Sequence, residues 1–157
     1  MGLIVKSSAF DTGQPIPRKH AYTGEGDNIS PPLSWSGAPE GTQSYALICD
    51  DPDAPSPKRP RPNPWVHWVV YNLPPDKTAL GERDEGGGVS GRSDFGQTGW
   101  GGPMPPPGSG THRYFFKVYA LDAKLGLKAG ATKDELLAAM EGHILAQGET
   151  YGTYERR

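Results

Sequence analysis

Residues 65–73 read WVHWVVYNL, and this stretch carries the clearest strand pattern in the chain. It is apolar on both faces, which is typical of a strand in the middle of a sheet that is covered on each side. Strict alternation predicts that one face carries Trp65, His67, Val69 and Tyr71. His67 is the exception in this apolar run, because a buried imidazole must find a hydrogen-bond partner or destabilise the fold.

Two further segments also have the character of core strands. Residues 44–49 (SYALIC) form a short apolar run between turn residues, which predicts a central strand. Residues 112–121 (HRYFFKVYAL) predict a long strand in which His112 and Tyr114 share one face and Arg113 lies on the other. Together with residues 65–73, these segments predict a mainly β protein.

The shorter elements are predicted nearer to the two ends of the chain. Residues 2–6 predict a short strand, and the prolines in residues 30–36 favour an edge strand or an extended segment in which Trp35 is buried. Residues 132–135 form a capping box, which begins a helix that we expect to run to about residue 146. Residues 148–155 then predict a last strand.

Length and composition restrict the class of protein. A chain of 157 residues is most simply one domain over residues 1–157, and its 22 glycines and 17 prolines indicate a loop-rich β protein. The net charge of −2 argues against nucleic-acid binding, and the single Cys49 gives neither a disulfide nor zinc-site spacing. With no membrane-length apolar run and no signal-peptide pattern, we expect a cytoplasmic protein without a transmembrane segment.

A long irregular loop, residues 99–111, reads GWGGPMPPPGSGT and leads into the strand at His112. Its glycines leave backbone N–H groups accessible, and its prolines stiffen the chain. Such a loop beside His112 and Tyr114 is suited to a small polar ligand, an anion in particular; a plain surface connection is the alternative. No glycine pattern matches a P-loop or a dinucleotide-binding fingerprint, so ATP hydrolysis and dinucleotide binding are unsupported.

Carboxylates follow the predicted strand at residues 44–49. Asp51 is followed by a proline, which holds it in an extended conformation and aims its side chain. Because the strand that carries His67 begins just after this loop returns, we expect Asp51 and His67 to meet. Residues 52–64 contain six prolines and three basic residues, which predicts a stiff exposed loop in which one X-Pro bond is a candidate for the cis form.

Three motifs together resemble the phosphatidylethanolamine-binding protein family, in particular its bacterial Raf-kinase-inhibitor-like branch. They are DPDAP at 51–55, GPMPP at 102–106 and HRY at 112–114. The likeness covers nearly the whole chain and includes YTGEGDNISPPLSW at 22–35 and GTYER at 152–156. It implies a β-sandwich of two packed antiparallel sheets with Greek-key connections, plus a C-terminal helix.

The resemblance also implies a small anion pocket at one end of the fold. Carried over residue by residue, the residues expected at this pocket are Asp51, Pro55, Trp65, His67, Gly102, Pro103, His112 and Tyr114. Gly102 would offer its N–H, while the prolines and the tryptophan would shape the rim. Two imidazoles, a phenol hydroxyl and a glycine N–H suit a phosphate monoester. Asp51 is compatible with an anion if it accepts from a histidine N–H or if the ligand is protonated.

The expected function is therefore a binding or regulatory protein, not an enzyme, that holds phosphate or a phosphorylated headgroup and needs no cofactor. Met104 stands where bacterial relatives often have cysteine, so thiol chemistry is not expected there. A rim tyrosine of some animal members is unmatched, with Pro62 nearest, and their longer C-terminal helix is missing. Both departures argue against a whole phospholipid as ligand, and more strongly against kinase inhibition.

Two alternatives from other classes stay open. The loop at 52–64 could dock a protease or a kinase, which would make the chain an inhibitor-type interaction protein, and a homodimer is a further candidate for this branch. His67, His112 and Asp51 could instead hold a metal ion in a hydrolase. Stoichiometric zinc or iron in the purified protein would favour this second alternative.

Overall fold

The computed structural model describes residues 2–157. The strands and the helix follow in the order β1 (Ile4–Lys6), β2 (Leu33–Ser36), β3 (Ser44–Asp51), β4 (Trp65–Leu73), β5 (Ala79–Leu80), β6 (Val89–Ser90), β7 (His112–Leu121), α1 (Lys133–Met140) and β8 (Ile144–Tyr154). A single 3-10 turn at Arg18–His20 precedes β2. The three strands predicted from apolar runs are all present, and β4 and β7 have the predicted bounds.

The strands form two antiparallel sheets, as predicted. The larger sheet has the order β6-β4-β3-β7-β8, and the smaller has the order β1-β2-β5. Strand β2 was expected at an edge but lies between β1 and β5. After β6, at one edge of the larger sheet, a long connection carries the chain across to β7 beside β3, the return that characterises a Greek key.

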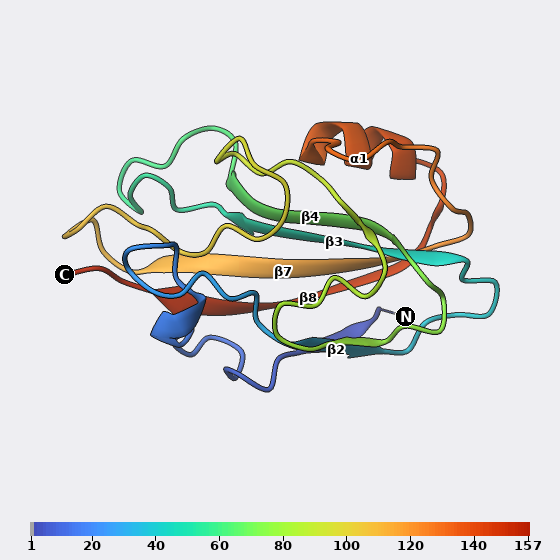
Figure 1. Cartoon of the computed structure of the whole chain (residues 1–157), viewed down its shortest axis with the longest axis horizontal. Helices are drawn as coiled ribbons and strands as arrows, with labels where there is room; N and C mark the ends of the chain where they lie inside the picture. Colours follow the sequence, from blue (N-terminus) through green and yellow to red (C-terminus); the bar gives the residue numbers. More distant parts are fainter. Residues whose placement is uncertain (1) are drawn as a thin grey trace.

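Each face of the larger sheet is covered by a different partner. Figure 1 shows α1 over one face and β2 beneath the other. Trp35 of the smaller sheet shares a buried cluster with Trp68 and Phe116 of the larger one. On the opposite face, Leu136 and Met140 of α1 belong to a second buried cluster of the larger sheet. Burial on both faces explains why β3 and β4 read as continuous apolar runs.

The helix begins where the sequence predicts and ends earlier. The Thr132 hydroxyl accepts from the Glu135 amide at 3.2 Å, and the Glu135 carboxylate accepts from the Thr132 amide at 2.9 Å. The helix ends at Met140, before Gly142, which has a φ of +81°. Residues 144–146, expected to be helical, instead pair with β7 as the start of β8. Strand pairing with β7 therefore decides the structure of residues 144–146, despite their local helical pattern.

A β-bulge in β4 reorients His67. Cys49 pairs with Trp68 and Asp50 pairs with Val66, so β4 has an extra residue at this point. The His67 ring therefore lies 5.0 Å from the ring of Tyr114, on the face that carries Trp68. The predicted alternation, which grouped His67 with Val69 and Tyr71, is wrong for that reason: those two residues lie on the α1 face.

Loops gather at the end of the larger sheet where β3 ends and β7 begins. Figure 1 shows residues 52–64 and 99–111 at this end, beside the C-terminus. The Ala54–Pro55 peptide bond is the one in the cis form among residues 2–157. No helix in this described part of the chain has the length and hydrophobicity needed to cross a membrane.

Candidate functional site

A cavity of about 220 Å³ opens among these loops. Six of the eight predicted residues line it, namely Asp51, Pro55, Trp65, His67, His112 and Tyr114. The lining residues that were not among the predicted eight are Ala54, Phe95, Met104, Pro105 and Pro106, and all of these except Phe95 belong to the DPDAP and GPMPP motifs. Since one water occupies about 30 Å³ of liquid, the cavity has room for a phosphate group with a short substituent.

Asp51 and His112 form a buried pair at the base of this cavity. They lie at the end of β3 and the start of β7, with exposed fractions of 2% and 0%. His112 Nδ1 donates to Asp51 Oδ2 at 2.7 Å, and Asp51 Oδ1 accepts from the Asp53 amide at 2.7 Å. Asp51 therefore accepts from a histidine N–H, as predicted. The histidine that donates to Asp51 is His112. His67, which was expected to meet Asp51, lines the same cavity.

His67 is held by the loop that follows β6. Its Nδ1 donates to the Gly101 carbonyl at 2.6 Å, and the Gly101 amide donates back to the His67 carbonyl at 2.9 Å. Burial lowers the pKa of His67 below 6.5, although the Gly101 bond and the charge of Asp51 oppose this shift. At neutral pH the ring is therefore uncharged, and its Nε2 is a hydrogen-bond acceptor at the cavity wall.

Tyr114 supplies a donor to the same cavity. Burial raises the pKa of Tyr114 well above its usual value, and the negative charge of Asp51 adds to the shift. The phenol therefore stays protonated. Its hydroxyl makes no hydrogen bond with any residue in the range 2–157, so it is available to a ligand.

Gly102 and Pro103 do not line the cavity, in contrast to the prediction. The Gly102 amide already donates to Asn28 Oδ1 at 2.8 Å, and the Pro103 carbonyl accepts from the Tyr22 amide at 3.0 Å. These bonds fix the loop onto the N-terminal segment. Asn28 was not predicted to have this role, although it lies in the YTGEGDNISPPLSW motif at 22–35. Its φ of +54° is a conformation that asparagine tolerates better than most residues.

Aromatic and proline side chains form the rim. Phe95 stacks on Tyr22 with ring centroids 4.4 Å apart, and it forms T-shaped contacts with Trp65 and His67 at centroid distances of 5.5 and 5.4 Å. No lysine or arginine is among the residues that line the cavity. The site therefore combines apolar walls with few polar groups, and the acidic residue among its lining is Asp51. Such a site disfavours a fully ionised phosphate.

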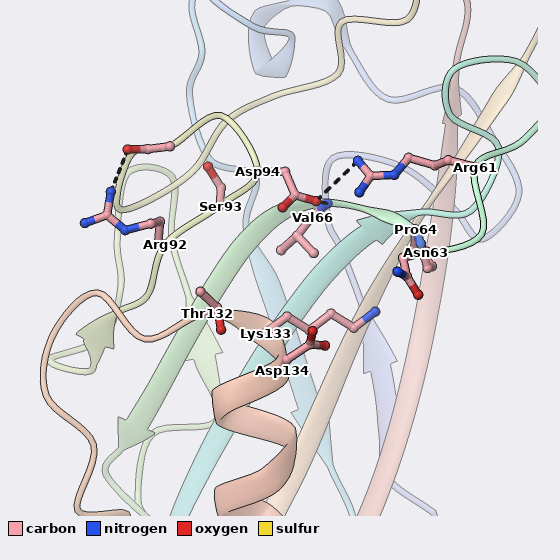
Figure 2. A pocket seen from close by; sticks show the side chains of 11 residues that line it. Arg61, Asn63, Pro64, Val66, Arg92, Ser93, Asp94, Thr132, Lys133 and Asp134 are labelled. Atoms are coloured by element: carbon pink, nitrogen blue, oxygen red, sulfur yellow. Dashed lines mark hydrogen bonds and ion pairs between the residues drawn. The ribbon is translucent and has the colours of Figure 1, made fainter.

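A second hollow, of about 340 Å³, lies between the start of α1 and the loops around Arg61 and Arg92 (Figure 2). Its cationic side chains already have partners. Arg61 faces Asp94 at 3.8 Å, Arg92 donates to the Gly96 carbonyl at 2.8 Å, and Lys133 donates to Asp50 at 2.7 Å. This hollow is therefore the weaker candidate for an anion.

The metal alternative gains no geometric support. Within residues 2–157, no three histidine, cysteine, aspartate or glutamate side chains are grouped so that they could hold a metal ion. Asp51 and His112 bond to each other, and His67 bonds to a backbone carbonyl.

Comparisons with known proteins agree with the fold. The model of the family described as phosphatidylethanolamine-binding protein matches residues 6–155. A UPF0098 protein of Methanothermobacter thermautotrophicus is 50% identical over 158 residues, covering 97% of this chain and 98% of that protein. A phosphatidylethanolamine-binding protein homolog from Chlamydia trachomatis has a TM-score of 0.89 at 43% identity, covering 99% of both chains. YbcL of E. coli has a TM-score of 0.88 at 36% identity, covering all of both.

Proposed function

Because the chain belongs to the phosphatidylethanolamine-binding protein family, in the branch that contains E. coli YbcL, we propose that it is a binding protein for phosphate or a phosphorylated headgroup. The observation that carries the proposal is one cavity lined by Asp51, His67, His112 and Tyr114. Its volume of about 220 Å³ suits a headgroup better than a whole phospholipid.

The polar groups of the cavity favour a ligand that brings a proton. Neutral His67 offers an acceptor, Tyr114 offers a donor, and Asp51 repels a second negative charge. A phosphate monoester has its second pKa near 6, so its monoanion has both a P–OH donor and acceptor oxygens. In our proposal the P–OH group donates to His67 Nε2 and a second oxygen accepts from Tyr114, while the apolar rim covers the substituent.

Phosphoethanolamine should bind more tightly at pH 6 than at pH 8, by roughly tenfold or more, since up to one proton per site is taken up. The sign follows from His67, whose pKa is lowered by burial in the free protein and would rise next to a bound anion. Protonation of either His67 or the ligand replaces an acceptor–acceptor contact with a hydrogen bond. Calorimetric titration at both pH values, in buffers of different ionisation enthalpy, measures the affinity and the proton uptake.

Tyr114→Phe provides the matched test, because it keeps the ring and removes only the hydroxyl. A hydrogen bond to a charged ligand contributes about 1.5–3 kcal/mol, so the affinity should fall by roughly 10- to 100-fold. Tyr119→Phe is the control, since Tyr119 is also on β7 but belongs to the cluster on the α1 face. The absence of heat from the wild type at both pH values, or equal affinities of the wild type and Tyr114→Phe, would reject the proposal.

A protein partner stays a prediction. Residues 57–60 and 62–63 of the proline-rich loop are exposed, and Pro55 joins this loop to the cavity. A protease or kinase that contacts this loop would therefore be sensitive to the occupant of the cavity. The homodimer and the cytoplasmic location also stay predictions.

A further inference from the structure

Ser109, His112 and Asp51 form a chain of hydrogen bonds beside the cavity. Binding of a phosphorylated ligand does not require such a chain. Ser109 Oγ lies 3.0 Å from His112 Nε2, and His112 Nδ1 lies 2.7 Å from Asp51 Oδ2. We propose that Ser109 is a nucleophile that takes the acyl group from a small ester, with His112 as its general base and Asp51 as the residue that positions His112. This proposal does not rest on phosphate binding.

The order of the groups is that of a nucleophile, a base and an orienting carboxylate, and both distances lie within the range of such relays. Asp51 accepts a hydrogen bond from the Nδ1–H group of His112, which leaves the lone pair of Nε2 directed toward Ser109. The Asp53 amide fixes the other oxygen of Asp51. Because His112 and Asp51 are almost fully buried, their pairing is not weakened by competing water.

Ser109 itself lies in a tight and partly exposed turn. Gly108 and Gly110 on either side have φ values of +75° and +107°, and the Ser109 amide donates to the Pro106 carbonyl at 3.0 Å. The Gly110 amide makes no hydrogen bond with another residue in the range 2–157. In several acyl-transfer enzymes the amide that follows the nucleophile stabilises the oxyanion, and Gly110 holds that position here.

The step is an ordinary acyl transfer from an ester R–CO–OR′. Ser109 Oγ bonds to the carbonyl carbon as its proton passes to His112 Nε2, and the carbonyl oxygen becomes an oxyanion beside the Gly110 amide. The C–OR′ bond then breaks, and the proton moves from Nε2 to the leaving oxygen. The products are acyl-Ser109 and the alcohol HOR′. The apolar cavity, which His112 also lines, would receive the group R.

Labelling with p-nitrophenyl butyrate tests the nucleophile. Intact-mass analysis of the wild type should show one butyryl group, and peptide mapping should place it on Ser109. Ser109→Ala should lose the adduct. Thr111→Ala should keep it, because the nearby hydroxyl of Thr111 donates to Glu155 instead. An unlabelled wild type, or equal labelling of the wild type and Ser109→Ala, would overturn the proposal.

A thiol variant tests the base independently of ester recognition. In Ser109→Cys the imidazole of His112 should favour the thiolate, so alkylation by iodoacetamide at pH 7 should be at least about tenfold faster than in Thr111→Cys. Cys49 gives little background because it is buried and its thiol pKa is raised by burial. Equal rates would overturn the assignment of His112 as the base. If Ser109 is butyrylated but titration with phosphoethanolamine gives no heat, only the proposed binding function is rejected. If phosphoethanolamine binds but Ser109 is not butyrylated, only this inference is rejected.

Discussion

Gly102→Ala should destabilise the protein by about 3 kcal/mol, at the upper end of the usual cost of overpacking. A Cβ atom at this position would lie 2.0 Å from the His20 carbonyl oxygen, 2.7 Å from the Ala21 carbonyl carbon and 2.9 Å from the Tyr22 amide nitrogen. All three are backbone atoms, so no side-chain rotation relieves the clash. For a domain of this size we expect a fall in melting temperature of roughly 6–12 °C.

Gly126→Ala is the control for this substitution. Gly126 is exposed, does not have a positive φ, and has no atom within 4 Å of an added Cβ. Its melting temperature should stay within about 2 °C of the wild type, because surface substitutions usually change stability by less than about 0.5 kcal/mol. Equal stability of the two variants would show that the loop at Gly102 is not packed against residues 20–22 as described.

Asp51→Asn should cost roughly 3 kcal/mol, because it breaks a buried charged hydrogen-bond pair. Each carboxylate oxygen of Asp51 accepts one N–H, from His112 and from Asp53. An asparagine has a single acceptor oxygen, so its NH₂ group must face one of these donors. Chemical denaturation measures the loss.

A second aspartate–histidine pair supplies the control. Asp122 accepts from His143 Nδ1 at 2.8 Å, yet both side chains are nearly half exposed. Solvent replaces the lost interaction there, so Asp122→Asn should change stability by less than about 1 kcal/mol. If both variants lost the same stability, burial of the Asp51–His112 pair could not be what makes it strong.

The sequence predicts those parts of the fold that depend on local pattern. The strands at 65–73 and 112–121 were predicted with the right bounds. The first is an almost continuous apolar run that is buried on both faces, and the second alternates buried with more exposed residues before its buried end. The face of His67 was not predictable, because it depends on how β4 pairs with β3 at the bulge. The end of α1 was missed for a related reason: residues 144–146 gain a ladder partner in β7.

In the candidate site, too, the residues placed by strands were predicted, and the contacts made between loops were not. Asp51, His67, His112 and Tyr114 were brought to one cavity by the strands that carry them. Gly102 was expected to offer its amide to a ligand, but that amide bonds to Asn28, which lies 74 residues away in the chain. The position of Ser109 against His112 was likewise invisible in the sequence, since the turn between the two residues decides it. Contacts between loops carry little local signal.

The most direct test of the binding function is a crystal structure at pH 6 with phosphoethanolamine. We expect tetrahedral density in the cavity of His67 and His112, with oxygens within hydrogen-bond distance of His67 Nε2 and the Tyr114 hydroxyl. Density only in the hollow lined by Arg61, Arg92 and Lys133, or solvent alone in the cavity at saturating ligand, would contradict it.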